Sequence, residues 1–313
     1  MDAAVAPLLP SEDHLDRDRV VEATTEVGPL WLDRAAESLT ETVLETGRWQ
    51  PDMSDLVARR LRPGMTVVDA GANIGFISVQ AAKLVGPSGR VFCVEADPAN
   101  ISILRANLWR NGCTNAEVLP VAAWFERADL NLTVVPEGGP FTHVTTGPPQ
   151  EATVPAYRLD ELVDGPVDFV KIDCEGTDHL VLRGATGLFE RNPDLIATVE
   201  FTPDHATHTG HTSEQILDVY REMGLRPFTV SVGGYLRPTT YERLASSGTE
   251  GRVITFDFAL SMRGSRKVLL QYYLLGLPKR IFERLLEFGG DLLEYVPERI
   301  RPRIRRRDRL GPH

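Results

Sequence analysis

The chain has 313 residues, of which 42% are hydrophobic and 25% are charged. This balance is typical of a soluble globular protein, and it excludes a disordered chain, a collagen and a bundle of membrane helices. The longest apolar stretch, residues 268–277, is interrupted by Gln271 and is too short to cross a bilayer. At about 100–200 residues per domain, the length allows one large domain or two ordinary ones.

Two further features of the composition predict a cytoplasmic protein. The first residues lack the basic region and apolar core of a signal peptide. The three cysteines, Cys93, Cys113 and Cys174, form no C-x-x-C pair, and such an odd, sparse set is typical of free thiols in a reducing compartment.

The net charge of −10 is unevenly distributed along the chain. Residues 261–313 hold 13 Lys or Arg and 6 Asp or Glu, a net charge of +7, so the first 260 residues carry −17. An acidic body disfavours nucleic acid as its substrate, because phosphate neutralisation supplies most of such affinity. The arginine-rich end, Arg301 to Arg309, predicts either a solvated tail or a contact with an acidic partner, an anionic membrane or RNA.

The predicted elements divide the chain into three parts. Residues 1–45 form an N-terminal extension that is weakly ordered at first, and a helix is predicted over residues 30–46. Residues 46–261 form the main domain. Residues 262–313 form a basic extension with an amphipathic helix that starts at Pro278. We expect this helix to dock on the body, to pair two chains or to lie on a membrane surface.

Within the main domain, short apolar runs rich in β-branched residues alternate with segments of helical periodicity. The predicted strands are 66–70, 90–95, 117–123, 168–173, 195–201, 226–232 and 252–261. The predicted helices are 52–61, 76–85, 98–111, 177–191 and 213–223. Alternation of buried strands with helices indicates a parallel α/β sheet whose two faces are both covered.

A longer stretch, residues 125–167, separates the third predicted strand from the fourth. It contains two further apolar segments, 130–135 and 153–155, that predict extra strands. The loop from Gly138 to Pro149 between them is rich in glycine and proline. Such an insertion over the carboxyl edge of a sheet predicts a lid.

The segment from Asp69 to Gly75 lies directly between the first predicted strand of the domain and its helix. Its glycines allow a sharp turn and a close approach of a ligand, and the helix that follows attracts negative groups to its amino end. Glu95 ends the second strand, where a carboxylate can accept hydrogen bonds from both hydroxyls of a ribose. Together these features predict an adenosine cofactor.

The glycine pattern of this loop decides between two cofactors. A dinucleotide site requires three glycines so that the backbone can touch a pyrophosphate, but the corresponding positions hold Gly71, Asn73 and Phe76. The pattern disfavours a nicotinamide cofactor and favours S-adenosylmethionine, which has no pyrophosphate. Asp69 can then face the ammonium group of that cofactor, directly or through water, and the loop amides can meet its carboxylate.

Three motifs of the chain resemble the FkbM family of S-adenosylmethionine-dependent methyltransferases. Residues 69–75 (DAGANIG) are similar to the family pattern D-x-G-A-N-x-G. Residues 94–98 (VEADP) are similar to E-P-x-P, with Ala96 where proline is usual. Residues 170–176 (VKIDCEG) resemble K-I-D-x-E-G, and Asp178 stands where the family has glutamate.

The resemblance covers roughly residues 45–260, and the segments Gly47-x-Trp49-x-Pro51 and 158–162 are also similar. It implies an α/β, Rossmann-like class I methyltransferase fold. The mostly parallel seven-stranded sheet has the order 3-2-1-4-5-7-6 with strand 7 antiparallel, and helices flank it, with N- and C-terminal helical extensions in this chain. The cofactor-binding residues that the motifs predict are Asp69, Gly71, Ala72, Asn73, Gly75, Glu95, Ala96 and Asp173.

Three carboxylates are the candidate catalytic residues. Asp173 ends the fourth predicted strand on the same face as Lys171, and in the implied strand order it lies beside the cofactor. Glu175 follows at the turn, and Glu200 ends the fifth strand, where a carboxylate without a role would be costly. They can hold an acceptor hydroxyl, take its proton or bind a hard cation. The sequence shows no dedicated cage for Mg²⁺, and Lys171 is expected to be a structural partner of a buried acid.

Other polar residues are weaker candidates. His205, His208 and His211 have a spacing that allows a metal cluster, but prolines, glycines and threonines around them favour a substrate-facing loop. His143, in the predicted lid, is a further candidate base. Cys174 has no histidine partner in the sequence and is expected to pack rather than react.

The resemblance implies an O-methyltransferase that acts on a hydroxyl of a small molecule, such as a natural product, a sugar or a glycolipid. One alternative is a nicotinamide-dependent oxidoreductase. Another is a catalytically silent interaction protein that uses the basic tail, although the presence of Asp69, Glu95 and Asp173 argues against it.

Overall fold

The structure is a computed structural model that describes residues 6–135, 141–147, 152–192, 194–201, 210–247 and 256–261. These residues all belong to the first of two compact units, residues 1–262, and the second unit, residues 263–313, lies outside them. The predictions for the basic extension, including docking or dimerisation through its helix, therefore fall outside the described residues. Within the described ranges, no helix is both long and apolar enough to span a bilayer.

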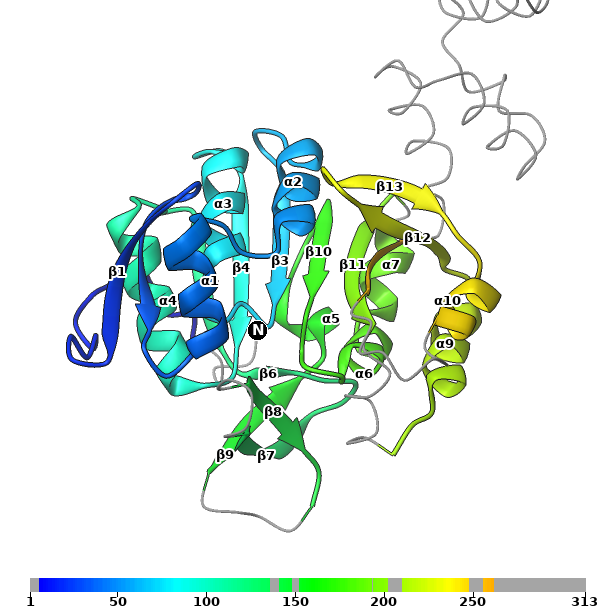
Figure 1. Ribbon diagram of the computed structural model, residues 1–313. Helices are drawn as coiled ribbons and strands as arrows, with labels where there is room; N and C mark the ends of the chain where they lie inside the picture. Colours follow the sequence, from blue (N-terminus) through cyan, green and yellow to red (C-terminus); the bar gives the residue numbers. More distant parts are fainter. Residues whose placement is uncertain are drawn as a thin grey trace, which may run out of the picture. The chain divides into compact units, whose positions relative to one another are not determined.

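The core of the first unit is a mostly parallel sheet of eight strands (Figure 1). Its strand order is β13-β12-β14-β11-β10-β3-β4-β5. In that order the strands span Tyr235–Pro238, Arg226–Ser231, Phe256–Ser261, Ile196–Phe201, Phe169–Ile172, Thr66–Ala70, Arg90–Glu95 and Ala116–Pro120. Neighbouring strands from β5 to β11 are parallel, whereas β14 is antiparallel to both β11 and β12.

Seven of these strands have the predicted order, and the antiparallel strand is the one that the family resemblance implied. The predicted number of strands was wrong, because β13 pairs with β12 and adds an edge strand. Gly233 and Gly234, both with positive φ, form the turn between β12 and β13. The prediction had instead joined β12 directly to β14, which follows only after helix α10 (Tyr241–Ser247).

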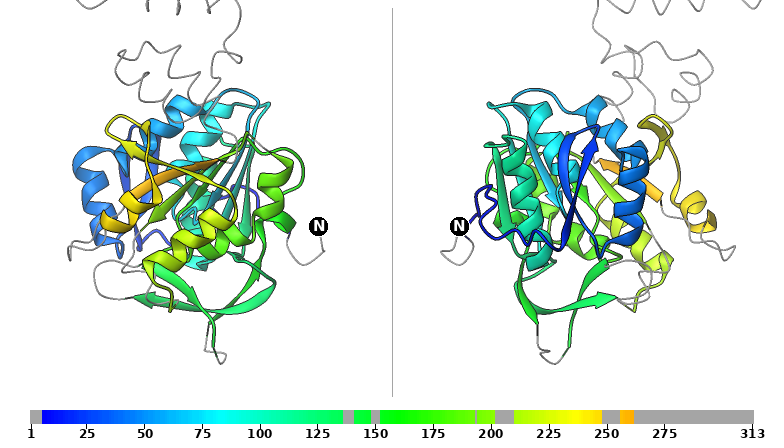
Figure 2. Two further views of the ribbon diagram at one scale, coloured as in Figure 1. Left: turned by 90° about the vertical axis from the view of Figure 1, so that its right-hand side faces the viewer. Right: turned by 60° about the vertical axis from the view of Figure 1, so that its left-hand side comes forward.

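Helices cover both faces of the sheet, as the two views of Figure 2 show. One face carries α2 (Pro51–Arg60), α3 (Phe76–Val85) and α4 (Pro98–Arg110), with α1 (Glu37–Thr46) beside them. The other carries α5 (Leu159–Leu162), α6 (Asp178–Arg183), α7 (Thr186–Arg191), α9 (Ser213–Glu222) and α10. On that second face, Val170 and Val199 of the sheet pack in one buried cluster with Leu182, Leu188 and Leu217. Because neither face is open to water, the strands are almost wholly apolar.

The insertion after β5 forms a second, four-stranded sheet, which lies below the main sheet in Figure 1. Its strands, in the order β6-β9-β7-β8, span Ala122–Ala123, Thr153–Tyr157, Ala128–Val135 and Phe141–Thr145. The two extra strands predicted here are β7 and β9. Strand β8 was not expected, since it lies inside the loop from Gly138 to Pro149 that was predicted between β7 and β9. Residues 138–140 and 148–149 of that loop fall outside the described residues.

The helix predicted over residues 30–46 is present only in its second part, and the segment before it forms strands. Strands β1 (Val20–Thr25) and β2 (Gly28–Asp33) form an antiparallel hairpin, and α1 begins only at Glu37. β1 is rich in β-branched residues, which favour strands, and Val20 and Ala23 are its buried residues. Leu8 also bridges Val118 on β5, so this segment completes the edge of the main sheet.

A buried asparagine ties the hairpin to the loop that follows β3. The side-chain amide of Asn107, on α4, donates to the carbonyl oxygens of Trp31 and Ile74 at 2.9 and 2.8 Å. Its oxygen accepts from the Trp31 N–H group at 2.6 Å. These three hydrogen bonds fix the hairpin against the helices, and the first compact unit includes the hairpin.

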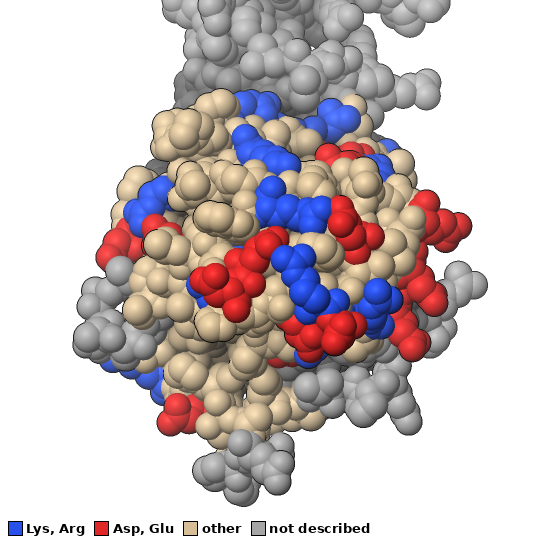
Figure 3. Space-filling view, turned by 90° about the vertical axis from the view of Figure 1, so that its left-hand side faces the viewer, with Lys and Arg blue, Asp and Glu red and all other residues tan. Residues whose placement is uncertain are grey.

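Basic and acidic side chains are interspersed on the face formed by the hairpin and α4 (Figure 3). Arg17 pairs with Glu12 and Arg110 with Glu22, and both guanidinium groups lie over the ring of Trp31, at 4.6 and 4.5 Å from its centroid. The glutamates neutralise the positive charge of these arginines locally, whereas phosphate binding requires a stripe of unneutralised basic side chains. That no nucleic acid binds the body stays a prediction.

Candidate active site

The loops after β3, β4 and β10 meet at the carboxyl ends of these strands, beside Glu200 at the end of β11. In the β3 loop, Gly71 has a φ of +74°, and a Cβ atom there would lie 1.8 Å from the carbonyl oxygen of Asp173. Gly75 has a φ of +88°, and a Cβ atom there would lie 2.5 Å from Cδ1 of Leu104 on α4. Gly71 therefore lets the β3 loop press against the β10 turn, and Gly75 lets α3 pack on α4.

The N–H groups of the β3 loop are already bonded. Those of Gly71 and Ala72 donate to the carbonyl oxygen of Val94 at 3.0 and 3.1 Å. They are therefore not available to the carboxylate of a cofactor, and the prediction that they would bind it was wrong. The first N–H groups of α3, at Phe76 and Ile77, donate to nothing within the described ranges, and both residues line the site. The helix end, rather than the loop, therefore offers free donors to an anionic group.

Glu95 lies at the end of β4 and is 8% exposed. Its Oε1 accepts from the N–H groups of Ala96 and Asp97, both at 2.9 Å, and its Oε2 accepts from that of Asn73 at 2.7 Å. Burial raises the pKa of Glu95 although these hydrogen bonds oppose the rise. Because a carboxylate accepts about four hydrogen bonds, Glu95 keeps room for about one more, on Oε2.

Lys171 on β10 is a buried cation, 4% exposed, between two carboxylates. Its Nζ lies 3.2 Å from Oδ1 of Asp69 and 3.4 Å from Oδ2 of Asp173, and it donates to the carbonyl oxygen of Gly71 at 3.0 Å. Burial alone would lower the pKa of Lys171, but attraction to Asp69 and Asp173 outweighs it and the pKa is raised. The expected structural role of Lys171 is confirmed.

Asp69 is fully buried below the site. Its Oδ2 accepts from the hydroxyl of Ser78 at 2.6 Å, and its Oδ1 faces Lys171. Asp69 lines neither of the two cavities described below. A direct contact with the ammonium group of a cofactor is therefore not available to it in this arrangement, and its charge acts through Lys171.

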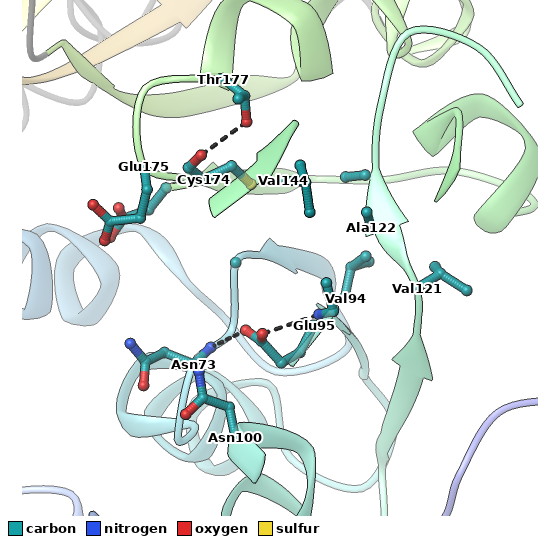
Figure 4. Close-up of a pocket in the computed structure, with 14 residues that line it drawn as sticks. Asn73, Val94, Glu95, Asn100, Val121, Ala122, Val144, Cys174, Glu175 and Thr177 are labelled. Atoms are coloured by element: carbon teal, nitrogen blue, oxygen red, sulfur yellow. Dashed lines mark hydrogen bonds between the residues drawn. The ribbon is translucent and has the colours of Figure 1, made fainter. Parts of the chain in front are cut away.

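Asp178 shapes the turn that follows β10. Its carboxylate accepts from the N–H groups of Cys174 and Gly176, at 3.3 and 3.2 Å, and Thr177 closes the turn by donating from Oγ1 to the carbonyl oxygen of Cys174 (Figure 4). The aspartate that replaces the glutamate of the family pattern thus reaches the amides of its own turn. Burial raises the pKa of the Cys174 thiol, which packs against the core as expected.

Glu175 sits at the centre of this turn with a φ of +51°, a left-handed conformation that is costly for a residue with a side chain. Burial, together with repulsion from Asp173 and Asp178, raises the pKa of Glu175 to about 8. Burial and repulsion from Asp173 likewise raise the pKa of Asp178 to about 7. A carboxyl group that titrates near neutral pH can both take and give a proton.

Two adjoining cavities occupy the site. The first, of about 70 Å³, lies beside Glu95, and Figure 4 shows Asn73 and Glu175 on one side of it and Val121 and Ala122 on the other. The second, of about 300 Å³, lies under Trp49 and extends to Glu200 on β11. Both cavities are lined by Gly71, Asn73, Asp173 and Glu175.

Most of the predicted site residues come together at these cavities. Those that line one or both are Gly71, Ala72, Asn73, Glu95, Ala96, Asp173, Glu175 and Glu200. Asp69 and Gly75 support the site from behind. Leu39, Gln50 and Asn100 also line the cavities, although they come from outside the three motifs and were not expected there. Of these three residues, only Gln50 was indicated by the sequence, because it lies within the Gly47-x-Trp49-x-Pro51 segment.

The weaker candidates divide between described and undescribed residues. His205 and His208 lie outside the described residues, as does the side chain of His143, whose backbone belongs to β8. His211 packs edge-on against the buried His179, with ring centroids 4.8 Å apart, and burial lowers the pKa of His179 to about 3. Among the described residues, no group of three or more His, Cys, Asp or Glu is arranged to hold a metal ion.

Comparison with known proteins identifies the class. The family model described as the methyltransferase FkbM domain matches residues 69–227, about half of the chain, from the β3 loop to β12. The chain therefore belongs to the FkbM methyltransferase family, as its three motifs predicted.

Individual relatives match shorter segments. A probable cobalt-precorrin-6B C(15)-methyltransferase (decarboxylating) of Sulfolobus acidocaldarius is 35% identical over 60 residues, 19% of this chain and 31% of the relative. A protein-L-isoaspartate O-methyltransferase of Methanothrix thermoacetophila is 39% identical over 59 residues, 19% of this chain and 28% of the relative. The matches thus span less than a third of the length of these relatives.

Among solved structures, the FkbM methyltransferase of Methylobacillus flagellatus KT is similar, with 17% identity and a TM-score of 0.42. The likeness covers 64% of this chain and 44% of that one, and it is too distant to transfer any property.

The buried ion triad predicts a large effect of a single substitution. Lys171→Met leaves Asp69 buried without its counter-charge, so we expect the free energy of unfolding to fall by about 3–5 kcal/mol. Adding Asp69→Asn to this variant removes the unpaired charge and should recover part of the loss. Urea denaturation of the parent, Lys171→Met and the double variant measures these free energies of unfolding. A Lys171→Met variant as stable as the parent would contradict a stabilising role of the ion triad.

The raised pKa of Glu175 predicts the pH dependence of stability. In the folded protein Glu175 holds its proton up to a pKa of about 8, whereas its ordinary value is 4.5, so folding favours the protonated form. The stability it contributes is fully present below pH 4.5 and is lost as the pH rises through about 8. The free energy of unfolding, relative to that of Glu175→Gln, should therefore fall between these values, and a pH-independent difference would refute the assignment.

Proposed function

We propose that this protein is an S-adenosylmethionine-dependent O-methyltransferase that methylates a hydroxyl of a small molecule, such as a natural product, a sugar or a glycolipid. The observation that carries the proposal is the pair of cavities that adjoin over Asp173 and Glu175. A cofactor with its nucleoside in the first cavity and an acceptor in the second would meet at these two carboxylates. Binding in adjoining cavities would hold the methyl group of the cofactor next to the acceptor hydroxyl, so that transfer takes place within one complex.

The residues around the first cavity, together with those on the side of the second cavity that adjoins it, fit the cofactor. Oε2 of Glu95, in the first cavity, has room for one ribose hydroxyl. The free N–H groups of Phe76 and Ile77, which line the second cavity, suit the carboxylate of the methionyl part. Asp173 places negative charge where the two cavities meet, which suits a sulfonium cation. The cavity is narrow for an adenosine, so we expect the small sheet, which closes it through Val144, to shift outward as the cofactor enters.

When bound, the cofactor supplies a methyl group that the sulfonium already activates, and the protein must position and deprotonate the acceptor. Asp173 is the principal polar group at the junction, and Glu200 can orient the acceptor from β11. Glu175 is the best placed base, because a pKa of about 8 lets it take the hydroxyl proton near neutral pH and return it to water afterwards.

The charges of the second cavity favour a hydroxyl over a carboxylate as the acceptor group. Among the described residues that line it, the only Lys or Arg is Lys171, whose ammonium is already held by Asp69, Asp173 and Gly71. An acceptor carboxylate would meet Glu200 and Asp173 without a counter-ion. This supports an acceptor different from the carboxyl groups that the isoaspartate methyltransferase of Methanothrix is named for.

The two alternatives receive less support. Membership of a methyltransferase family argues against a nicotinamide-dependent oxidoreductase. A silent interaction protein would have no use for two carboxylates at the junction of two cavities. A cytoplasmic location accords with the buried free thiols of Cys93 and Cys113. Mg²⁺ has no support among the described residues.

Cofactor binding is tested by calorimetry with S-adenosylmethionine and NADH. We expect the protein to bind the first and not the second, and Gly71→Ala to weaken binding at least about tenfold, because a Cβ atom would displace the Asp173 turn. Gly112→Ala is the matched control, since Gly112 also has a positive φ but nothing within 4 Å of a Cβ atom. Binding of NADH alone would overturn the proposal.

Methyl transfer is tested by incubating metabolite extracts with labelled cofactor and identifying the products by mass spectrometry. We expect a methyl ether and a rate that rises with pH through about 8, where Glu175 loses its proton. Glu175→Gln should slow transfer about 10²–10⁴-fold while cofactor affinity is kept. A methyl ester or a C-methylated product, or a variant with the full rate, would contradict the assigned chemistry.

A further inference from the structure

The turn between α1 and α2 holds an unfavourable backbone conformation at the second cavity. Gln50 has a φ of +43° and directly precedes Pro51, which begins α2. The left-handed region is disfavoured for a residue with a side chain, and a following proline pushes a residue toward extended conformations instead. Such a conformation persists only where the surroundings hold it, and it is concentrated at functional sites.

Ion pairs on both sides of the turn hold it in place. The guanidinium group of Arg48 pairs with Glu26, at the tip of the hairpin, at 2.6 Å and with Asp55 on α2 at 2.7 Å. The hydroxyl of Ser54 donates to the other oxygen of Glu26 at 2.6 Å. The turn is therefore anchored to the hairpin and to α2 without any contribution from the Gln50 side chain.

The Gln50 side chain is directed instead to the candidate catalytic carboxylate. Its Nε2 donates to Oδ2 of Asp173 at 3.0 Å, across 123 residues of sequence. The same oxygen faces Nζ of Lys171 at 3.4 Å. Within the described ranges, Oδ1 of Asp173 accepts no hydrogen bond. Two donors thus hold one oxygen and leave the other for a ligand.

We propose that Gln50 is a positioning residue, which with Lys171 clamps Oδ2 of Asp173 so that Oδ1 is presented to the methyl-bearing end of the cofactor. The inference rests on the proposed function, because it takes the junction of the cavities as the place of the sulfonium. Lys171 alone cannot fix the Asp173 carboxylate, because its ammonium group is shared with Asp69 and Gly71. With only the contact between Nζ of Lys171 and Oδ2, the Asp173 carboxylate could still rotate. The Gln50 amide supplies the second point that fixes its plane.

The test compares two ligands that differ in charge at the sulfur. S-adenosylmethionine carries the sulfonium cation and S-adenosylhomocysteine a neutral thioether, so a well-placed Asp173 carboxylate affects the affinity of the first more than that of the second. Gln50→Leu should lower the preference for the cation about three- to tenfold, the value of one hydrogen bond, and leave the affinity for S-adenosylhomocysteine within about twofold. Calorimetry on the full chain measures both.

Two further variants make the result specific. Gln80→Leu is the matched control, because Gln80 lines neither cavity and donates from Nε2 to the carbonyl oxygen of Ser54 rather than to Asp173. It should leave the preference unchanged. In an Asp173→Asn background, Gln50→Leu should have no further effect on the preference. Equal loss of affinity for both ligands would show a merely structural role and overturn the proposal, as would an unchanged preference.

A failure of the proposed function would look different. If the parent protein binds neither ligand, the cofactor assignment fails, and the clamp is then tested by crystal structures of the ligand-free parent and of Gln50→Leu. We expect the Asp173 carboxylate to be turned or spread over several orientations in the variant and single in the parent. The same ordered carboxylate in both would overturn the clamp.

Discussion

The structure of the site depends on one buried cation. Lys171 lies between Asp69 and Asp173 and donates to the carbonyl oxygen of Gly71, so it joins β3 to β10 at the edge where the sheet meets its ligand loops. A charge buried this deeply is tolerable only with such partners, and removing any one of them leaves the others unpaired. The same contacts that stabilise the core therefore fix the carboxylate at the junction of the two cavities.

Negative charge around this cation has a chemical consequence. Asp173, Glu175 and Asp178 lie within one short turn, and their mutual repulsion and burial raise the pKa of Glu175 to about 8 and that of Asp178 to about 7. Carboxyl groups whose ionisation is made costly in this way are suited to proton transfer near neutral pH, and a cationic ligand would favour their ionised form. The N–H groups of Cys174 and Gly176 donate to the Asp178 carboxylate and partly offset the cost of its burial.

Much of this could be predicted from the sequence, because the motifs lie at strand ends, where periodicity and glycines set the local structure. The strand and helix that flank the β3 loop have their predicted bounds, Thr66–Ala70 and Phe76–Val85. The hairpin at Val20–Asp33 is a local pairing, and it was missed because the end of β2 was assigned to the helix predicted over residues 30–46. The contact of Gln50 with Asp173 was missed, since it joins segments 123 residues apart. The bonding of the loop amides was missed for the same reason: their acceptor, Val94, lies on the neighbouring strand.

The central claim is that the two cavities hold a methyl donor and its acceptor, with Asp173 and Glu175 between them. A crystal structure of the protein with S-adenosylhomocysteine tests it most directly. We expect the ribose at Glu95, the carboxylate at the amino end of α3 and the sulfur at Asp173, facing the larger cavity. A ligand bound elsewhere, or with its sulfur turned away from that cavity, would contradict it.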